Sequence, residues 1–267
     1  MVDKSEKFSW LVRTGYFARA VLYAMLGFVA LTSADKMSQG SQGIMRAIED
    51  LPGGALILWI VAIGLIGYSL FRFASFFFDI ENNGSDKTGW AKRIGHAGSG
   101  IGHSALAWLA IEVASDFGAS GGGGGAEAAT DTVLDMAFGG TIVGILGIIF
   151  FVVAAYQLKK AITGSFMDRI AADAPSATRA LGTIGFAART VVYAIIGWSL
   201  FDAGFGSRDA EGVRTLGDAL ASLAGSGLPF TLTAIGLLVF GLFSLVLARY
   251  RIIPTLSPDG RVPSFRA

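Results

Sequence analysis

The chain has 267 residues, of which 53% are apolar and only 15% are charged, and its mean hydropathy is +0.60. Soluble domains carry charge on about 25% of their residues, so water is not the main solvent of this chain. A formal net charge of +1 provides no basic surplus for binding nucleic acid. The absence of cysteine excludes disulfides, thiolate nucleophiles, iron–sulfur clusters and cysteine zinc sites.

Six apolar runs are long enough to cross a hydrocarbon core of about 30 Å as helices. In chain order they lie at 11–33, 53–76, 95–115, 138–158, 181–203 and 226–248. None of them alternates with period two as a barrel strand would, and within lipid only a helix satisfies its own backbone. The sequence therefore predicts six transmembrane helices, the first of them an uncleaved span rather than a signal peptide.

The distribution of lysine and arginine predicts the orientation, because cytoplasmic loops hold most of these residues. The N-terminus, the 77–94 and 159–180 loops, the C-terminus and the adjoining helix ends carry 17 of the 21 basic residues. The other side carries the remaining four: Lys36, Arg46, Arg208 and Arg214. Both termini are therefore predicted to be cytoplasmic.

Three segments of the sequence are copies of one another and align without gaps at offsets of 80 and 170. They are GYFARAVLYAMLG at 15–27, GHAGSGIGHSALA at 95–107 and GFAARTVVYAIIG at 185–197. Each starts the first helix of a helix pair, so the chain is predicted to repeat one two-helix unit three times. The units are expected at about 8–78, 90–162 and 179–252, within a single membrane domain spanning 1–267.

Successive helix pairs enter the membrane in the same direction, so parallel repeats are related by an axis near the membrane normal. The predicted fold class is an all-α membrane protein with six transmembrane helices. These helices form three parallel hairpins with pseudo-threefold symmetry, and both chain ends face the cytoplasm.

The whole pattern resembles a bacterial membrane family known as domain of unknown function 1206. The resemblance rests on the repeated first helices, on AYQLKKAITGSFMDRI at 155–170 and on ARYRII at 248–253. The middle copy departs from its siblings, because it lacks their Arg and Tyr. The resemblance implies a multi-pass protein of the bacterial inner (cytoplasmic) membrane and implies no activity.

Two arginines, Arg19 and Arg189, lie inside predicted spans at equivalent positions of the first and third copies. A charge at the bilayer centre costs at least ~2.5 kcal/mol, so each needs a structural or functional reason. Three interpretations remain open: snorkelling to the cytoplasmic headgroups, pairing with a carbonyl or carboxylate of another helix, or a site for an ion, an anion or a lipid headgroup.

Tyr23, His103 and Tyr193 occupy one equivalent position in the three copies. With the two arginines they form a predicted intramembrane polar cluster, which is compatible with a proton relay, a polar ligand or hydrogen bonds between helices. His96 lies two turns from His103, too far along the helix for the two to share one metal ion. A single axial haem ligand is the only cofactor role left open, and no metal or cofactor is expected.

Small residues recur on the first helix of each unit and predict close helix packing. The candidate packing positions are Gly15, Gly27, Gly95, Gly98, Gly102, Gly185 and Gly197. The basic residues at the inner end of the fourth span, Lys159, Lys160 and Arg169, are compatible with contact to anionic lipid or with setting the topology.

No serine nucleophile elbow, metal-binding helix motif or dinucleotide fingerprint occurs, so we expect no catalytic residue and no enzyme.

The main hypothesis is a non-catalytic helix bundle, acting as an accessory or structural subunit or as a lipid-interacting module. Its expected partners are membrane lipids and subunits of a larger membrane complex. The alternative is a channel or carrier for a small solute or ion along the pseudo-threefold axis. A third option, an enzyme acting on lipid, requires two polar residues within hydrogen-bond reach in a cavity open to the bilayer.

Overall fold

The computed structural model describes residues 4–32, 40–81, 83–115, 125–207 and 209–253. All regular elements among these residues are helices, with no β-strand, and one isolated bridge pairs Ile170 with Arg251. The elements are α1 (Lys4–Thr32), α2 (Gly40–Glu49), α3 (Gly54–Phe78), α4 (Lys87–Ala114), α5 (Gly125–Leu134), α6 (Gly139–Thr163), the 3₁₀ helix η2 (Ser165–Arg169), α7 (Thr178–Phe205), α8 (Leu216–Ala221) and α9 (Leu228–Tyr250).

Five of the helices are long and apolar enough to cross a membrane. The qualifying segments are Val12–Thr32, Gly54–Phe78, Gly139–Thr163, Thr178–Phe205 and Leu228–Tyr250. Each overlaps one of the spans expected at 11–33, 53–76, 138–158, 181–203 and 226–248. A 25-residue helix such as α3 is about 37 Å long, which exceeds the hydrocarbon core.

The sixth expected span, at 95–115, falls in α4, which is a 28-residue helix but is not among the five qualifying segments. Glycine, serine and two histidines dilute the apolar residues between positions 95 and 104. Its length therefore matches the prediction, and its hydropathy falls short of it.

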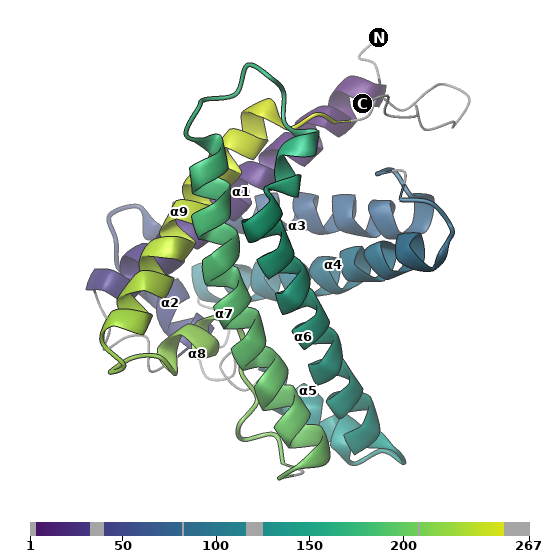
Figure 1. The fold of residues 1–267 in the computed structure, drawn as a ribbon. Helices are drawn as coiled ribbons and strands as arrows, with labels where there is room; N and C mark the ends of the chain where they lie inside the picture. The colour runs from purple at the N-terminus through teal and green to yellow at the C-terminus, as the bar shows by residue number, and fades with distance from the viewer. Residues whose placement is uncertain (1–3, 33–39, 82, 116–124, 208, 254–267) are drawn as a thin grey trace.

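Neighbouring long helices pack in the order α4, α3, α1, α9, α7 and α6. The first and third units pack as hairpins, α1 on α3 and α7 on α9, whereas α4 and α6 of the second unit are not packed along each other. Figure 1 shows the α3–α4 pair running across the direction of the α6–α7 pair. Three parallel, pseudo-threefold hairpins are therefore not what the structure shows.

Connection length explains why α4 packs on α3 rather than on α6. The α3–α4 connection spans only 79–86, and short connections place consecutive helices side by side. The α4–α6 connection spans 115–138 and contains α5, so it imposes no such pairing. Gly100 of α4 lies against the ring of Phe73 of α3, which fixes the face that α4 buries.

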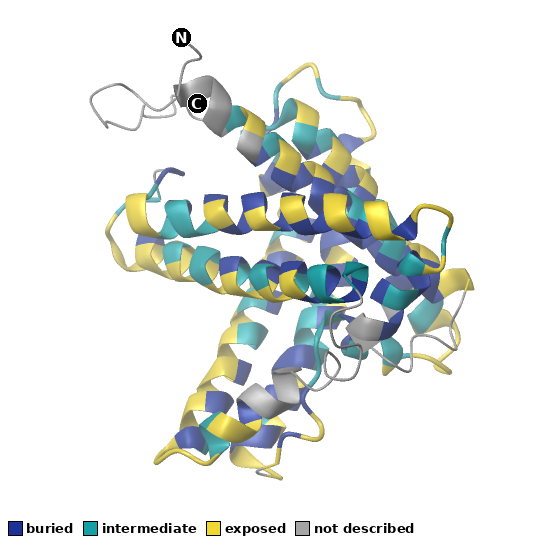
Figure 2. Ribbon diagram, turned by 180° about the vertical axis from the view of Figure 1, so that it is seen from behind, coloured by how far each residue is buried: buried dark blue, intermediate teal, exposed yellow. Residues whose placement is uncertain are grey.

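The core is built from the facing sides of α1, α3, α7 and α9, where Tyr16, Tyr68, Phe71, Phe240 and Phe243 are among the largest fully buried side chains. Large apolar side chains also remain exposed along the outer faces of the helices, and Figure 2 shows exposed residues following these faces. Water-soluble monomers rarely expose apolar patches of this extent, so the surface fits a lipid environment.

The predicted packing glycines fall into two groups. Gly15 lies against Tyr68, Gly185 against Phe240, Gly27 against Ala234 and Leu238, and Gly197 against Gly147, Phe150 and Phe151, each across a helix–helix contact. Gly95, Gly98 and Gly102 of α4 face open space instead. Among the described residues, no helix packs on the face of α4 that carries these three glycines, so they have no packing role there.

Candidate functional site

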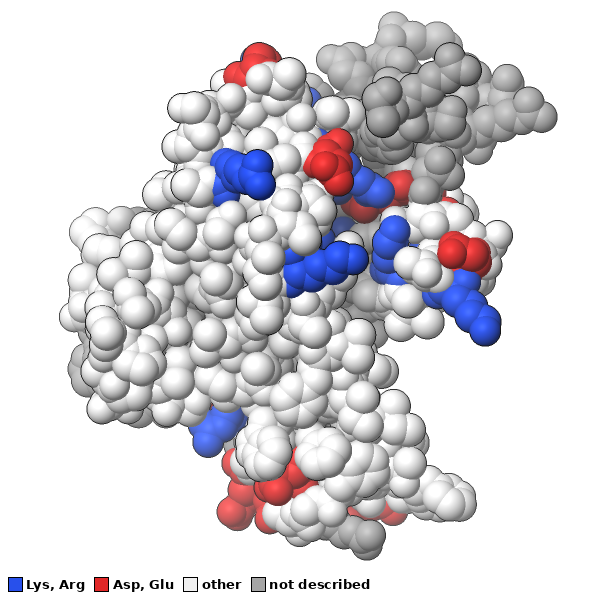
Figure 3. All heavy atoms as spheres, in the orientation of Figure 1, with Lys and Arg blue, Asp and Glu red and all other residues white. Residues whose placement is uncertain are grey.

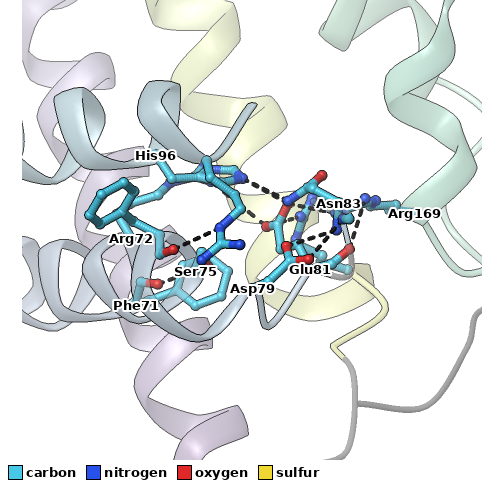
Figure 4. Close-up of polar contacts among 12 residues, drawn as sticks. Phe71, Arg72, Ser75, Asp79, Glu81, Asn83, His96 and Arg169 are labelled. Carbon is cyan, nitrogen blue, oxygen red and sulfur yellow. Dashed lines mark hydrogen bonds and ion pairs between the residues drawn. The ribbon is translucent and has the colours of Figure 1, made fainter. Parts of the chain in front are cut away.

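The most highly charged site surrounds Glu81, a buried carboxylate in the connection between α3 and α4. Arg169 donates to Glu81 Oε2 at 2.5 Å and to the Glu81 carbonyl at 3.2 Å, and Arg251 donates to Oε1 at 2.7 Å. The Glu81 side chain is 7% exposed. We call Arg72, Glu81, His96, Arg169 and Arg251 the Glu81 cluster; Figure 4 shows how most of its side chains converge on the carboxylate.

Arg72 and His96 complete this cluster from α3 and α4. Arg72 Nη1 lies 3.7 Å from Glu81 Oε1 and 2.7 Å from His96 Nδ1. Because a guanidinium only donates, Nδ1 accepts, and the proton of the neutral ring sits on Nε2. His96 Nε2 faces Glu81 Oε2 at 3.5 Å, which suits that tautomer.

Each of the three predicted units contributes to the cluster just after its second long helix. Glu81 follows α3, Arg169 ends η2 after α6, and Arg251 directly follows α9. Backbone pairing holds the last two segments together: Ala171 N donates to Tyr250 O at 2.9 Å, and Ile252 N donates to Arg169 O at 3.0 Å. One carboxylate thus ties together the ends of three helices that lie far apart in sequence.

The ionisation of Glu81 makes stability depend on pH. Burial alone would raise the pKa of Glu81, but Arg251, Arg72, His96 and Arg169 lower it by more, so the pKa lies well below its usual range. Around the ordinary glutamate pKa of about 4.3, the unfolded state therefore binds more protons than the folded state. We expect this stabilisation to be complete above about pH 5 and to be lost progressively as the pH falls below about 4.3. Unfolding by SDS in detergent micelles at several pH values measures it, and Glu81→Gln is expected to lack this part of the pH slope.

Tyr68 links the Glu81 cluster to the interior of the bundle. Its hydroxyl oxygen accepts from Arg72 Nε at 2.9 Å, from Arg72 Nη2, and from Arg19 Nη1 at 2.8 Å. Arg19 Nε also donates to Ser244 Oγ at 3.1 Å. A continuous polar chain therefore runs from Glu81 through Arg72 and Tyr68 to Arg19 and Ser244.

Removing the Tyr68 hydroxyl is expected to be costly because it is the shared acceptor of two arginines. We expect Tyr68→Phe to lower the free energy of unfolding by about 2 kcal/mol, the range for hydrogen bonds to charged groups. The exposed Tyr156 provides the matched control, and Tyr156→Phe is expected to change stability by less than about 0.5 kcal/mol. Equal, small effects of the two variants would show that the Tyr68 hydroxyl contributes nothing to the stability of the bundle.

The structure places both predicted intramembrane arginines inside the bundle, Arg19 at 5% exposure and Arg189 at 8%. The guanidinium carbon of Arg19 lies 5.0 Å from the ring centroid of Phe240, and that of Arg189 lies 4.6 Å from the same centroid. Neither arginine is extended to the surface, so snorkelling does not describe them. Their direct hydrogen-bond partners are the hydroxyls of Tyr68, Ser244 and Tyr193.

The three equivalent residues of the polar cluster do not meet in one layer. The rings of Tyr23 and Tyr193 both lie beside Arg189, within 5.5 Å and 4.8 Å of its guanidinium carbon. His103 instead packs against Tyr68 with its ring tilted, at 4.7 Å between ring centroids, and its Nδ1 pairs with the Ser99 carbonyl at 2.7 Å. The structure thus brings Tyr23, Arg189 and Tyr193 together and places His103 on the α3 side.

The Glu81 cluster was not predicted as a site from the sequence. The sequence analysis did not single out Glu81, and it considered His96 only as a metal ligand. Two signals were nevertheless available: Arg169 and Arg251 lie in the two segments, 155–170 and 248–253, that stood out beside the repeats. Their convergence on one carboxylate depends on tertiary contacts.

On the face shown in Figure 3, most lysine and arginine side chains lie over the upper part of the molecule, together with several acidic side chains. A further acidic group lies at the lower end, near the start of α6 and the end of α7. The cytoplasmic placement of the termini stays a prediction from the distribution of basic residues in the sequence.

Comparison with known proteins places the chain in a family. The family model described as Domain of Unknown Function (DUF1206) matches three times, over residues 14–77, 94–164 and 184–251. The chain belongs to the DUF1206 family. Internal repeats fit these three matches, and each match ends at or before a segment that supplies a residue of the Glu81 cluster.

The DUF1206 chain also resembles a curated bacterial protein over nearly its full length. It is 28% identical over 261 residues to "Uncharacterized protein YxxB" of Bacillus subtilis (strain 168), covering 93% of this chain and 94% of that protein. No solved structure matches the chain. Neither name assigns an activity, so function has to be argued from the chain's own geometry.

Proposed function

We propose that this DUF1206 protein is a non-catalytic helix bundle of the bacterial inner membrane. In this proposal it works as an accessory or structural subunit, or as a lipid-interacting module, and its partners are membrane lipids and other membrane proteins. The exposed apolar faces of the five membrane-length helices provide the surface for such contacts.

One observation carries this proposal: the polar residues of the Glu81 cluster pair with each other and so connect the ends of several helices. Glu81 receives Arg72 from α3, Arg169 from the end of η2 and Arg251 from the end of α9. The carboxylate is already paired with these three arginines, and His96 lies between Arg72 and Glu81. Groups paired in this way hold helices together and are poorly placed for general acid or base catalysis.

The channel or carrier alternative receives less support from the packing. The ring centroid of Phe240 lies within 5.0 Å of the guanidinium carbons of both buried arginines, and the ring contacts Tyr23, Phe186 and Phe243. A continuous aqueous path would have to pass this aromatic cluster. Tyr23 and Tyr193 lie beside Arg189, whereas His103 lies beside Tyr68, so these three residues do not line one common path.

Purification in a mild detergent tests the accessory role. The tagged full-length chain is extracted from its native membrane, and its mass and copurifying proteins are determined by native mass spectrometry. We expect a particle larger than the monomer with a reproducible partner. A strictly monomeric particle with neither copurifying protein nor retained lipid would contradict the proposal.

A flux measurement distinguishes the channel or carrier alternative from a purely structural role. Liposomes containing the purified chain are loaded with chloride, phosphate or a pH-sensitive dye, and leakage is compared with that of empty liposomes. A purely structural bundle predicts equal leakage from liposomes with and without the chain. Saturable flux that depends on Arg19 and Arg189 would support a carrier and overturn the purely structural role.

A further inference from the structure

Two positive charges, on α1 and α7, lie beside one phenylalanine ring in the apolar interior of the bundle. Arg19 and Arg189 each place their guanidinium carbon within 5.0 Å of the same Phe240 ring centroid. Both side chains are more than nine-tenths buried. The two guanidinium carbons are therefore less than 10 Å apart, in a medium that screens their charges poorly.

No carboxylate balances this pair of charges within the described residues. Their hydrogen-bond acceptors are neutral hydroxyls, and the acid that binds the nearby Arg72 is already shared with Arg169 and Arg251. Aromatic faces surround both guanidinium groups and offset part of the cost of burial: Tyr16 and Tyr68 beside Arg19, Tyr23 and Tyr193 beside Arg189, and Phe240 beside both. Two like charges still repel each other, and ring quadrupoles do not cancel a net charge.

Each arginine also keeps one nitrogen without a hydrogen-bond partner. Across the described part of the chain, the buried side-chain atoms in this condition are Arg19 Nη2, Arg189 Nε, His103 Nε2 and Ser69 Oγ. Two belong to the two arginines, and His103 packs against Tyr68, the tyrosine that binds Arg19. A buried donor without an acceptor is unfavourable, and the penalty is larger for a charged group.

We propose that Arg19 and Arg189 together bind an oxyanion of the phosphate class between α1, α7 and α9. One N–H from each of two guanidinium groups fits an anion that offers several oxygen acceptors, and arginine recognises phosphate oxygens well. The polar chain Glu81–Arg72–Tyr68 leads from the helix ends to Arg19. The phosphate group comes either from the headgroup of an anionic lipid or from free phosphate. This site is independent of the accessory role, since a non-catalytic subunit and a carrier could both contain it.

Two measurements on the full-length chain identify the source of the phosphate group. Thermal unfolding in dodecylmaltoside is followed by circular dichroism while inorganic phosphate replaces chloride at constant ionic strength. In parallel, native mass spectrometry counts phosphatidylglycerol or phosphatidylcholine retained by the protein from mixed micelles. We expect either a saturable rise in Tm with phosphate or retention of one phosphatidylglycerol per chain in preference to phosphatidylcholine.

The double variant Arg19→Gln/Arg189→Gln is expected to abolish whichever response occurs. Arg19→Met/Arg189→Met provides a second test, because removing both charges also removes the need for an anion and should leave a folded, phosphate-insensitive protein. Arg249, exposed at the end of α9, is the control, and Arg249→Gln should respond like the wild type. A response to phosphate alone identifies free phosphate, and a response to lipid alone identifies a headgroup. Responses that are absent from the wild type, or unchanged in both double variants, would overturn the site.

Discussion

Replacing Glu81 by glutamine is expected to lower the free energy of unfolding by about 3 kcal/mol, the lower end of the cost of breaking a buried ion pair. The glutamine keeps the size of the side chain but removes the charge that Arg72, Arg169 and Arg251 share. Three cations would then lie together without a counter-charge. Titration of SDS into dodecylmaltoside micelles, followed by tryptophan fluorescence, measures the loss.

The matched control for this variant is Asp168, an exposed carboxylate one residue before Arg169. Asp168→Asn is expected to change the free energy of unfolding by less than about 0.5 kcal/mol, as for most surface substitutions. The double variant Glu81→Gln/Arg169→Gln should recover part of the loss, since it removes one of the uncompensated charges. If Glu81→Gln and Asp168→Asn cost the same, the Glu81 cluster does not hold the helix ends together.

Leucine at Gly185 is expected to destabilise the bundle by about 3 kcal/mol, the upper range for overpacking a core. A Cβ at Gly185 would lie 2.8 Å from the Cα of Phe240, closer than van der Waals contact allows. The obstacle is the backbone of α9, so the strain cannot be relieved by turning a side chain. The α7–α9 contact has to separate to admit leucine.

Gly95 is the equivalent residue of the middle copy and gives the opposite expectation. It faces open space, so Gly95→Leu is expected to change the free energy of unfolding by less than about 1 kcal/mol, helped by the better helix propensity of leucine. The same SDS titration compares the two variants directly. A loss at Gly95 as large as that at Gly185 would show that another helix packs on this face of α4 in the folded protein.

The helices could be predicted from sequence because their signal is local. A run of apolar residues long enough to cross a bilayer must be helical to satisfy its backbone, whatever lies beside it. Five of the six expected spans correspond to membrane-length apolar helices. The sixth, at 95–115, was predicted in the same way from the length of its apolar run, and the glycines and histidines of α4 keep this helix out of the membrane-length apolar set.

The candidate site was predictable only in part. Arg19 and Arg189 stood out because charge inside an apolar run is costly, and the structure places both beside Phe240. The separation of His103 from Tyr23 and Tyr193 could not be foreseen from equivalent positions in the copies. It follows from the packing of α4 on α3, which carries His103 to Tyr68.

By itself, the sequence determined the helical class, the positions of the apolar helices, the threefold repetition and the presence of two cations in apolar surroundings. All of these depend on composition and on spacing along one segment. Only the tertiary structure decided that Glu81 collects arginines from the ends of three units, that α4 and α6 stay apart, and that the charges of Arg19 and Arg189 have no described carboxylate beside them. These features depend on which distant segments meet, and a pairing of side chains more than 80 residues apart leaves no periodicity for a sequence to display.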